Sequence, residues 1–292
     1  MTTATATISS DRLTAGISAL GAELQHVTAN GGCELLWDGD PAFWLGRAPI
    51  LFPVIGVLEG GCYRLDGKSY PMPKHGFARH STFEIVESAT DAVTFRLTAS
   101  GATRSIYPFE FQLDIRFSIA GARLTLAAKI ANVGDTSMPT SFGFHPALRW
   151  PLPYGQPRAE HRLRFERDEP APMRRIDQNG LLLPEPQPTP VIDDTLVLRD
   201  ELFIADALIF DRLDSRRVTY EAQTGPELEI EFADFPTLGV WTKPGAGFIC
   251  IESWQGCSDP VGYSGDIRDK PGIVEIAPGS SRQFAMRISL QD

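Results

Sequence analysis

The feature that most constrains this chain is a long run in which apolar and polar side chains alternate. Across residues 109–119 every second residue is apolar, and the intervening residues are Glu110, Gln112, Asp114, Arg116 and Ser118. A period of two places successive side chains on opposite faces of an extended strand, so we expect one face of this strand to be buried. The alternation resumes across residues 124–130 after Ala120 and Gly121, which predicts an antiparallel hairpin.

Further strands are indicated along the whole chain. Residues 227–232 and 284–290 alternate in the same way, and shorter candidates are residues 82–86, 93–97, 195–198, 218–222 and 248–251. The 26 glycines and 23 prolines interrupt the chain at short intervals, and neither a three-turn amphipathic helix nor a strand–helix–strand alternation is apparent. The pattern predicts an all-β fold, a large antiparallel β-sandwich of two packed sheets.

One segment breaks the strand pattern. Residues 151–190 contain nine prolines, and proline is excluded from central strands because it lacks a backbone donor. The strand patterns on both sides are alike and no change in composition marks a boundary. We therefore interpret the segment as a surface excursion of one domain that spans residues 1–292.

Composition excludes several classes of protein. The formal net charge of −10 disfavours nucleic acid, whose binding needs clustered cations. No run of 18 apolar residues predicts a membrane span, and no basic region followed by an apolar run predicts a secretory leader. We expect a cytoplasmic protein, monomeric or homodimeric, with reduced thiols at Cys33, Cys62, Cys250 and Cys257.

Histidines are scarce, so each of the five is a candidate acid or base. His145 follows a short apolar segment and precedes Pro146, which places an imidazole where a strand ends; a structural loop histidine is the alternative. His75 lies four residues before Arg79 in a loop, a spacing suited to binding hydroxyls or an anion, unless both charges pair with their neighbours. His26 and His161 have polar surroundings and are expected at the surface.

Two charged residues lie in apolar surroundings. Arg47 is a lone charge among apolar residues, so it requires an anionic or multiply hydroxylated partner, or else a structural ion pair. Glu252 ends an apolar strand beside Trp254, where desolvation raises a carboxylate's pKa and suits it to act as a general base. Trp254 is also suited to stacking on a sugar ring. A structural strand-end carboxylate is the alternative for Glu252.

Other chemistries have less support. A metal site from His75, His80, His145 and Glu252 is conceivable, but the chain has neither an HExxH nor a CxxC motif, so we expect no metal. The glycine-rich residues 56–61 lack the Lys-Ser/Thr of a phosphate loop, and no GxSxG motif supplies a serine nucleophile.

Taken together, these segments resemble the aldose 1-epimerase (galactose mutarotase) superfamily, and within it the LacX-like branch. The similarity extends nearly from end to end, through residues 21–24, 36–40, 47–53, 75–79, 143–146, 241–245 and 250–254. It implies a large antiparallel β-sandwich, the interconversion of α and β anomers of a free aldohexose, and no cofactor. By position, His145 matches the family's general acid and Glu252 its base. Sugar-holding residues are expected at Arg47, His75, Arg79, Asp206 and Trp254.

The chain departs from the family pattern at one position, and three alternative functions stay open. Relatives in this branch have proline at the position of Ser253, and its loss is expected to free a backbone donor and loosen a turn. Arg47 and Arg79 are candidates for a phosphate clamp, which would indicate a hexose-6-phosphate mutarotase. A sugar-binding protein without catalysis is the second alternative. Glycoside hydrolysis is the third, and it requires a second carboxylate beside Glu252.

Overall fold

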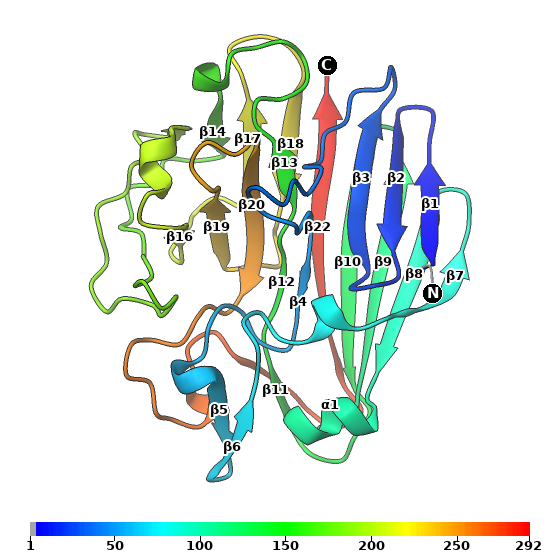
Figure 1. Ribbon diagram of the computed structural model, residues 1–292, viewed down its shortest axis with the longest axis vertical. Coiled ribbons are helices and arrows are strands. Elements are labelled where there is room, and N and C mark those ends of the chain that lie inside the picture. Colours follow the sequence, from blue (N-terminus) through cyan, green and yellow to red (C-terminus); the bar gives the residue numbers. More distant parts are fainter. Residues whose placement is uncertain (1–3) are drawn as a thin grey trace.

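The computed structural model describes residues 4–292, and its main regular structure is strands arranged in two layers (Figure 1). The larger layer is a nine-stranded antiparallel sheet. In spatial order its strands are β15 (Thr195–Val197), β14 (Arg162–Phe165), β17 (Arg217–Glu221), β18 (Glu227–Glu231), β22 (Ser281–Gln291), β10 (Arg123–Asn132), β9 (Phe111–Ala120), β8 (Ala92–Thr98) and β7 (Glu84–Ser88).

The second layer is divided between two sheets. The three-stranded sheet β1 (Thr5–Ser9), β2 (Leu13–Ser18) and β3 (Glu23–Ala29) lies in front of β8 to β10 in Figure 1. The six-stranded sheet consists of β16 (Leu208–Phe210), β19 (Thr237–Trp241), β20 (Phe248–Gln255), β12 (Phe142–Phe144) and β4 (Ile50–Leu51), with β13 (Ala147–Arg149) also paired to β20. This arrangement confirms the predicted all-β antiparallel sandwich.

Smaller elements close the ends of the layers. Two strand pairs form there, β5 (Cys62–Leu65) with β6 (Lys68–Pro71) and β11 (Met138–Thr140) with β21 (Val274–Ile276). The α-helix α1 (Gly101–Ile106) has six residues, and no helix in the described range 4–292 has the length and apolar character needed to cross a membrane.

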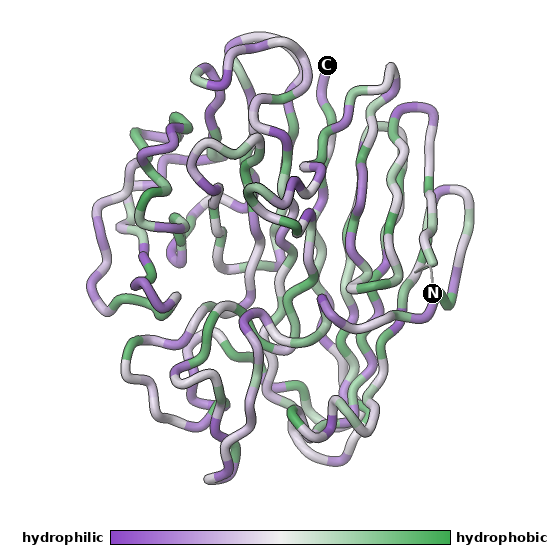
Figure 2. Tube along the Cα trace, viewed as in Figure 1, coloured by the Kyte–Doolittle hydropathy of each residue, from purple (hydrophilic) through white to green (hydrophobic). Residues whose placement is uncertain are grey.

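The predicted hairpin is confirmed as β9 and β10, which pair from Ala120 with Arg123 to Phe111 with Asn132. Every second residue of β9 is fully or almost fully buried, as the alternation required. Figure 2 shows the same mixing of hydrophobic and hydrophilic residues along the strands of both layers. The period of two therefore determines which face of each strand enters the core.

Strand β20 has two different faces. Ile249 and Ile251 join the large apolar cluster between the layers, which extends from Ile8 to Leu290. Cys250, Glu252 and Trp254 point the opposite way, because side chains alternate along a strand. Loops cover that outer face, so β20 carries a carboxylate on a buried surface outside the main core.

The proline-rich segment is only partly a surface excursion. β14 lies within residues 151–190 and pairs on both sides, with β15 and with β17. Its position has a simple reason, since residues 158–169 contain no proline. The expectation that His161 lies at the surface is wrong: it is fully buried, and its Nε2 accepts a hydrogen bond from the Leu152 N–H at 3.0 Å.

Candidate active site

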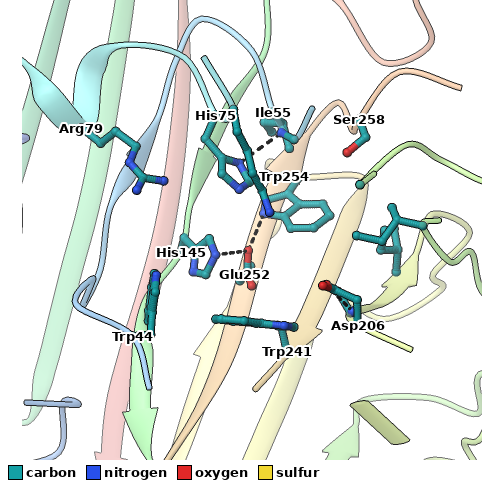
Figure 3. Close-up of a pocket in the computed structure, with 16 residues that line it drawn as sticks. Trp44, Ile55, His75, Arg79, His145, Asp206, Trp241, Glu252, Trp254 and Ser258 are labelled. Atoms are coloured by element: carbon teal, nitrogen blue, oxygen red, sulfur yellow. Dashed lines mark hydrogen bonds and ion pairs between the residues drawn. The ribbon is translucent and has the colours of Figure 1, made fainter. Parts of the chain in front are cut away.

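The strand register brings His145 and Glu252 together. β12 pairs Phe144 with Ser253, and β13 pairs Ala147 with Cys250. Both pairs follow one register, which places His145 directly opposite Glu252 in the gap between β12 and β13. The distance from His145 Nε2 to Glu252 Oε2 is 3.2 Å (Figure 3).

A tryptophan fixes the other side of the carboxylate. The Trp254 Nε1–H donates to Glu252 Oε2 at 3.1 Å, since residues two apart on β20 share a face. The indole has room because two neighbouring positions are glycines. A Cβ at Gly143 would lie 2.9 Å from the indole, and a Cβ at Gly239 would lie 2.6 Å from it.

The expectation of a loosened turn at Ser253 is wrong. Ser253 lies inside β20, paired with Leu238 of β19 on one side and Phe144 of β12 on the other. It is fully buried, and its hydroxyl has no hydrogen-bond partner within residues 4–292. Strand pairing therefore holds Glu252 in place without a proline after it.

Burial acts in opposite directions on the two central groups. It raises the pKa of Glu252 well above its usual value, and Lys74 and the Trp254 hydrogen bond lower it to a lesser degree. Burial lowers the pKa of His145 from 6.5 to about 3. The raised pKa of Glu252 agrees with the sequence-based interpretation. Both shifts favour uncharged forms, so burial favours the proton of the pair on Glu252.

His75 stands beside this pair, in a backbone conformation that is rare for residues other than glycine. Its φ is 65°, and its ring lies edge-on to that of His145 with centroids 5.8 Å apart. The Gly56 N–H donates to His75 Nδ1 at 3.1 Å, and the His75 N–H donates to the Gly56 carbonyl at 2.9 Å. Burial, then the neighbouring His145, lowers the pKa of His75.

The pair forms part of the wall of a cavity of about 210 Å³. This is below the roughly 300–1,000 Å³ of sites for drug-sized ligands, and it suits one small polar molecule. The cavity combines three indole rings, two cationic side chains and two carboxylates, contributed by Trp44, Trp241, Trp254, Lys74, Arg79, Asp206 and Glu252. It opens into a wider groove that shares Trp44, Trp241 and Asp206.

The sequence predicts that seven residues share one site: the five sugar-binding residues and the central pair. The structure brings six of them together. His75, Arg79, His145, Asp206, Glu252 and Trp254 all line the cavity, and Arg47 does not. Arg47 Nη1 donates to the Gln25 carbonyl at 2.5 Å, and its backbone N–H donates to Glu23 Oε1 at 2.8 Å. Arg47 thus satisfies its charge with backbone oxygen and holds β3, so the expected clamp of Arg47 with Arg79 does not form.

One group of potential metal ligands includes the central pair. His145, Cys250 and Glu252 are all buried, with ligand atoms within 4.8 Å of one another. Burial, then Glu252, raises the pKa of the Cys250 thiol well above its usual value. A metal-binding cysteine must be a thiolate, so this environment disfavours Cys250 as a metal ligand.

Comparison with known proteins identifies the family. The model of the aldose 1-epimerase family matches residues 4–283 of the chain. The chain belongs to the aldose 1-epimerase family. Membership makes it an enzyme of the isomerase class and confirms the resemblance drawn from the sequence.

Individual relatives agree with this membership. LacX of Lactococcus lactis subsp. lactis is 30% identical over 281 residues, covering 93% of this chain and 94% of LacX. A galactose mutarotase-like protein from Lactobacillus casei ATCC 334 has a TM-score of 0.92 and 29% identity, covering 99% of this chain and 100% of that one. A galactose mutarotase related enzyme from Lactobacillus acidophilus has a TM-score of 0.89 and 26% identity, covering 99% and 98%. These similarities confirm the LacX-like branch.

Several residues of the aldose 1-epimerase pocket were not among the sequence predictions. Trp44 packs against the His145 ring with centroids 5.1 Å apart, and Trp241 meets it edge-on at 6.1 Å. Both lie within or beside segments that carry the resemblance, and a tryptophan near a proposed sugar site was the available signal. No sequence signal pointed to Lys74, next to His75, because an exposed lysine in a loop is common.

Proposed function

We propose that this protein interconverts the α and β anomers of a free aldose by general acid–base ring opening. One observation carries the proposal: the 3.2 Å contact between Glu252 Oε2 and His145 Nε2 in the wall of a cavity of about 210 Å³. Ring opening needs one proton removed and one supplied. A carboxylate and an imidazole in contact are suited to both transfers.

The steps follow from the two groups. The Glu252 carboxylate takes the proton of the anomeric hydroxyl, and the His145 imidazolium gives a proton to the ring oxygen. The bond between the anomeric carbon and the ring oxygen breaks, which leaves an open-chain aldehyde. Rotation about the C1–C2 bond presents the other face of the carbonyl, and the ring closes as both protons return. Arg79 and His75 hold the oxygens on which charge develops.

The protonation of the empty pocket fits this sequence. Once the ring has opened, Glu252 holds the proton and His145 is neutral. This is the arrangement that burial favours, because it raises the pKa of Glu252 and lowers that of His145. The protonation that burial favours is therefore the one that accompanies the open-chain aldehyde. Before a cyclic sugar can react, a proton must move from Glu252 to His145 across the 3.2 Å contact.

The pH dependence is expected to differ from that of a free histidine. Catalysis needs one proton in the pair: two protons leave no base, and none leaves no acid. The second proton binds only near the lowered pKa of His145, about 3, and the last leaves only at the raised pKa of Glu252. We therefore expect kcat/KM not to fall as the pH is lowered through 6.5 to about 5, and to fall at high pH only where Glu252 loses its proton, above the usual carboxyl range. A fall in kcat/KM as the pH is lowered from 6.5 to 5 would contradict this protonation scheme.

A phosphorylated aldose is the second candidate, and two cations support it. Lys74 and Arg79 both line the cavity, and neither forms an ion pair with a carboxylate in the described part of the chain. Lys74 replaces Arg47 in the clamp expected from the sequence. A phosphate at the mouth of the pocket would meet both charges.

The test is exchange NMR at anomeric equilibrium with glucose, galactose, mannose, arabinose, xylose and glucose 6-phosphate. Faster exchange between anomer signals of the free sugars, in proportion to protein concentration, is the expected result. Acceleration of glucose 6-phosphate alone would favour the phosphorylated substrate. Sugar signals that broaden on binding while anomer exchange stays unchanged would reject catalysis and indicate a sugar-binding protein.

A further inference from the structure

Arg175 is a buried arginine that forms no ion pair within residues 4–292, and the Asp206 carboxylate acts on its charge only from beyond ion-pair distance. Only 8% of the residue is exposed, and burial lowers its pKa. Its Nη1 donates to the carbonyls of Asp206 at 2.8 Å and Ala207 at 3.2 Å, and its Nη2 donates to the Leu202 carbonyl at 2.8 Å. A buried charge is costly unless its donors are satisfied. Here the backbone of a single segment accepts from both terminal nitrogens, while the Nε–H has no partner within residues 4–292.

That segment presents Asp206 to the cavity. It consists of the 3₁₀ turn η4 (Asp200–Phe203) and the residues that lead into β16. Asp206 lies in the left-handed region with φ of 65°, a conformation that residues other than glycine seldom adopt. Its Oδ1 accepts the Ala207 N–H at 2.7 Å, and its side chain lines the cavity (Figure 3). Within the segment the Asp206 N–H also donates to the Phe203 carbonyl at 3.1 Å, and Arg175 adds contacts to the Asp206 and Ala207 carbonyls from outside it.

The segment that carries Arg175 also contributes to a second wall of the cavity. The preceding residue, Arg174, exchanges backbone hydrogen bonds with Ile209 of β16, and the following residue, Ile176, lines the cavity. The guanidinium therefore ties the wall at Ile176 to the wall at Asp206. The two walls lie far apart in the sequence.

We propose that Arg175 is a positioning residue that sets Asp206 for binding a sugar hydroxyl, an inference that rests on the proposed function in taking the cavity as the sugar site. Asp206 then acts as a hydrogen-bond acceptor toward bound sugar, and Arg175 acts only through it. The effect of losing Arg175 falls on sugar affinity and spares the proton transfers of Glu252 and His145.

The neighbouring Arg174 provides a matched control. Its guanidinium donates to the Leu183 carbonyl at 2.5 Å and lies 3.5 Å from Asp211, so it contacts neither Asp206 nor the loop before it. Arg174→Met removes an arginine from the same segment, and Arg175→Met removes the one that contacts the backbone of Asp206. A general loosening of the segment would affect both variants alike.

The experiment compares Arg175→Met, Arg175→Lys, Arg174→Met, Asp206→Ala and the Asp206→Ala/Arg175→Met double variant. Sugar affinity is read from the fluorescence of the pocket tryptophans, kcat and KM from exchange NMR, and folding from thermal melts. Loss of a charged donor predicts that Arg175→Met weakens affinity and raises KM about tenfold with kcat nearly unchanged, and that Arg175→Lys is intermediate. Arg174→Met stays within about twofold of wild type, and Arg175→Met adds less than about twofold in the Asp206→Ala background.

Two results would overturn the proposal. One is a full additive effect of Arg175→Met in the Asp206→Ala background, and the other is an equal loss of affinity in Arg174→Met. If Arg175→Met does not fold, Arg175→Lys with and without Asp206→Ala decides the question. A wild-type protein that binds sugar without exchanging anomers would reject the proposed function, while the affinity measurements would still test Arg175.

Discussion

Replacing Glu252 with glutamine is expected to lower the rate of anomer exchange at least about 100-fold, the usual contribution of a general base. The amide keeps the size of the side chain, and its oxygen still accepts the Trp254 N–H that now bonds Glu252 Oε2 at 3.1 Å. It cannot take the proton of the anomeric hydroxyl. Exchange NMR on the best substrate measures the rate, and an unchanged thermal melt shows that the fold is retained.

Cys250 supplies the control for Glu252→Gln. It lies two residues earlier on the same face of β20 and is fully buried. Cys250→Ala is expected to cost some stability through the small cavity it leaves, with turnover close to wild type. Near-normal activity in Glu252→Gln would remove Glu252 from the central role. A large loss of turnover in Cys250→Ala would instead point to thiol or metal chemistry at this position.

The His145→Ala variant is expected to lose a similar factor, at least about 100-fold, because ring opening then lacks its acid. The loss has a different signature from that of Glu252→Gln. Removing the imidazole leaves a space beside Trp44 and Trp241, whose rings lie 5.1 and 6.1 Å from that of His145. Added imidazole is expected to occupy this space and restore part of the rate, measured by exchange NMR over a range of imidazole concentrations.

A second buried histidine, His161, is a control that distinguishes the loss of a catalytic group from the loss of a buried ring. His161 is fully buried, and its ring accepts the Leu152 N–H at 3.0 Å. His161→Gln is expected to lower the melting temperature while turnover per folded molecule is unchanged. Wild-type activity in His145→Ala, or a comparable loss of turnover in His161→Gln, would show that His145 is not the acid.

Much of the fold was predictable because it depends on local alternation. The period of two across residues 109–130 gave the β9–β10 hairpin and its buried face. The proline-rich segment was harder, since proline content alone does not show where a proline-free stretch is long enough for a strand. β14 occupies such a stretch, and His161 is buried beside it for reasons that lie in distant residues.

The site was predictable in its members and not in its geometry. Glu252 and His145 stand out by residue type and setting, but their contact depends on a register shared by β12, β13 and β20, which no local pattern specifies. Arg47 shows the opposite error. A lone charge among apolar residues needs a partner, and the partner is a backbone carbonyl of β3 that the sequence does not reveal.

The contact between His75 and Gly56 has a consequence for selectivity. Because His75 Nδ1 accepts the Gly56 N–H, the neutral ring carries its proton on Nε2, and lowering of the pKa of His75 keeps the ring neutral. His75 thus offers its ligand a donor and never an acceptor. A deoxy sugar that lacks the oxygen opposite this nitrogen leaves a buried N–H unsatisfied, at a cost of about 1–3 kcal/mol. If the cavity binds a sugar as proposed, we expect the Gly56 N–H, by fixing the proton of His75 on Nε2, to determine which sugar hydroxyl is required.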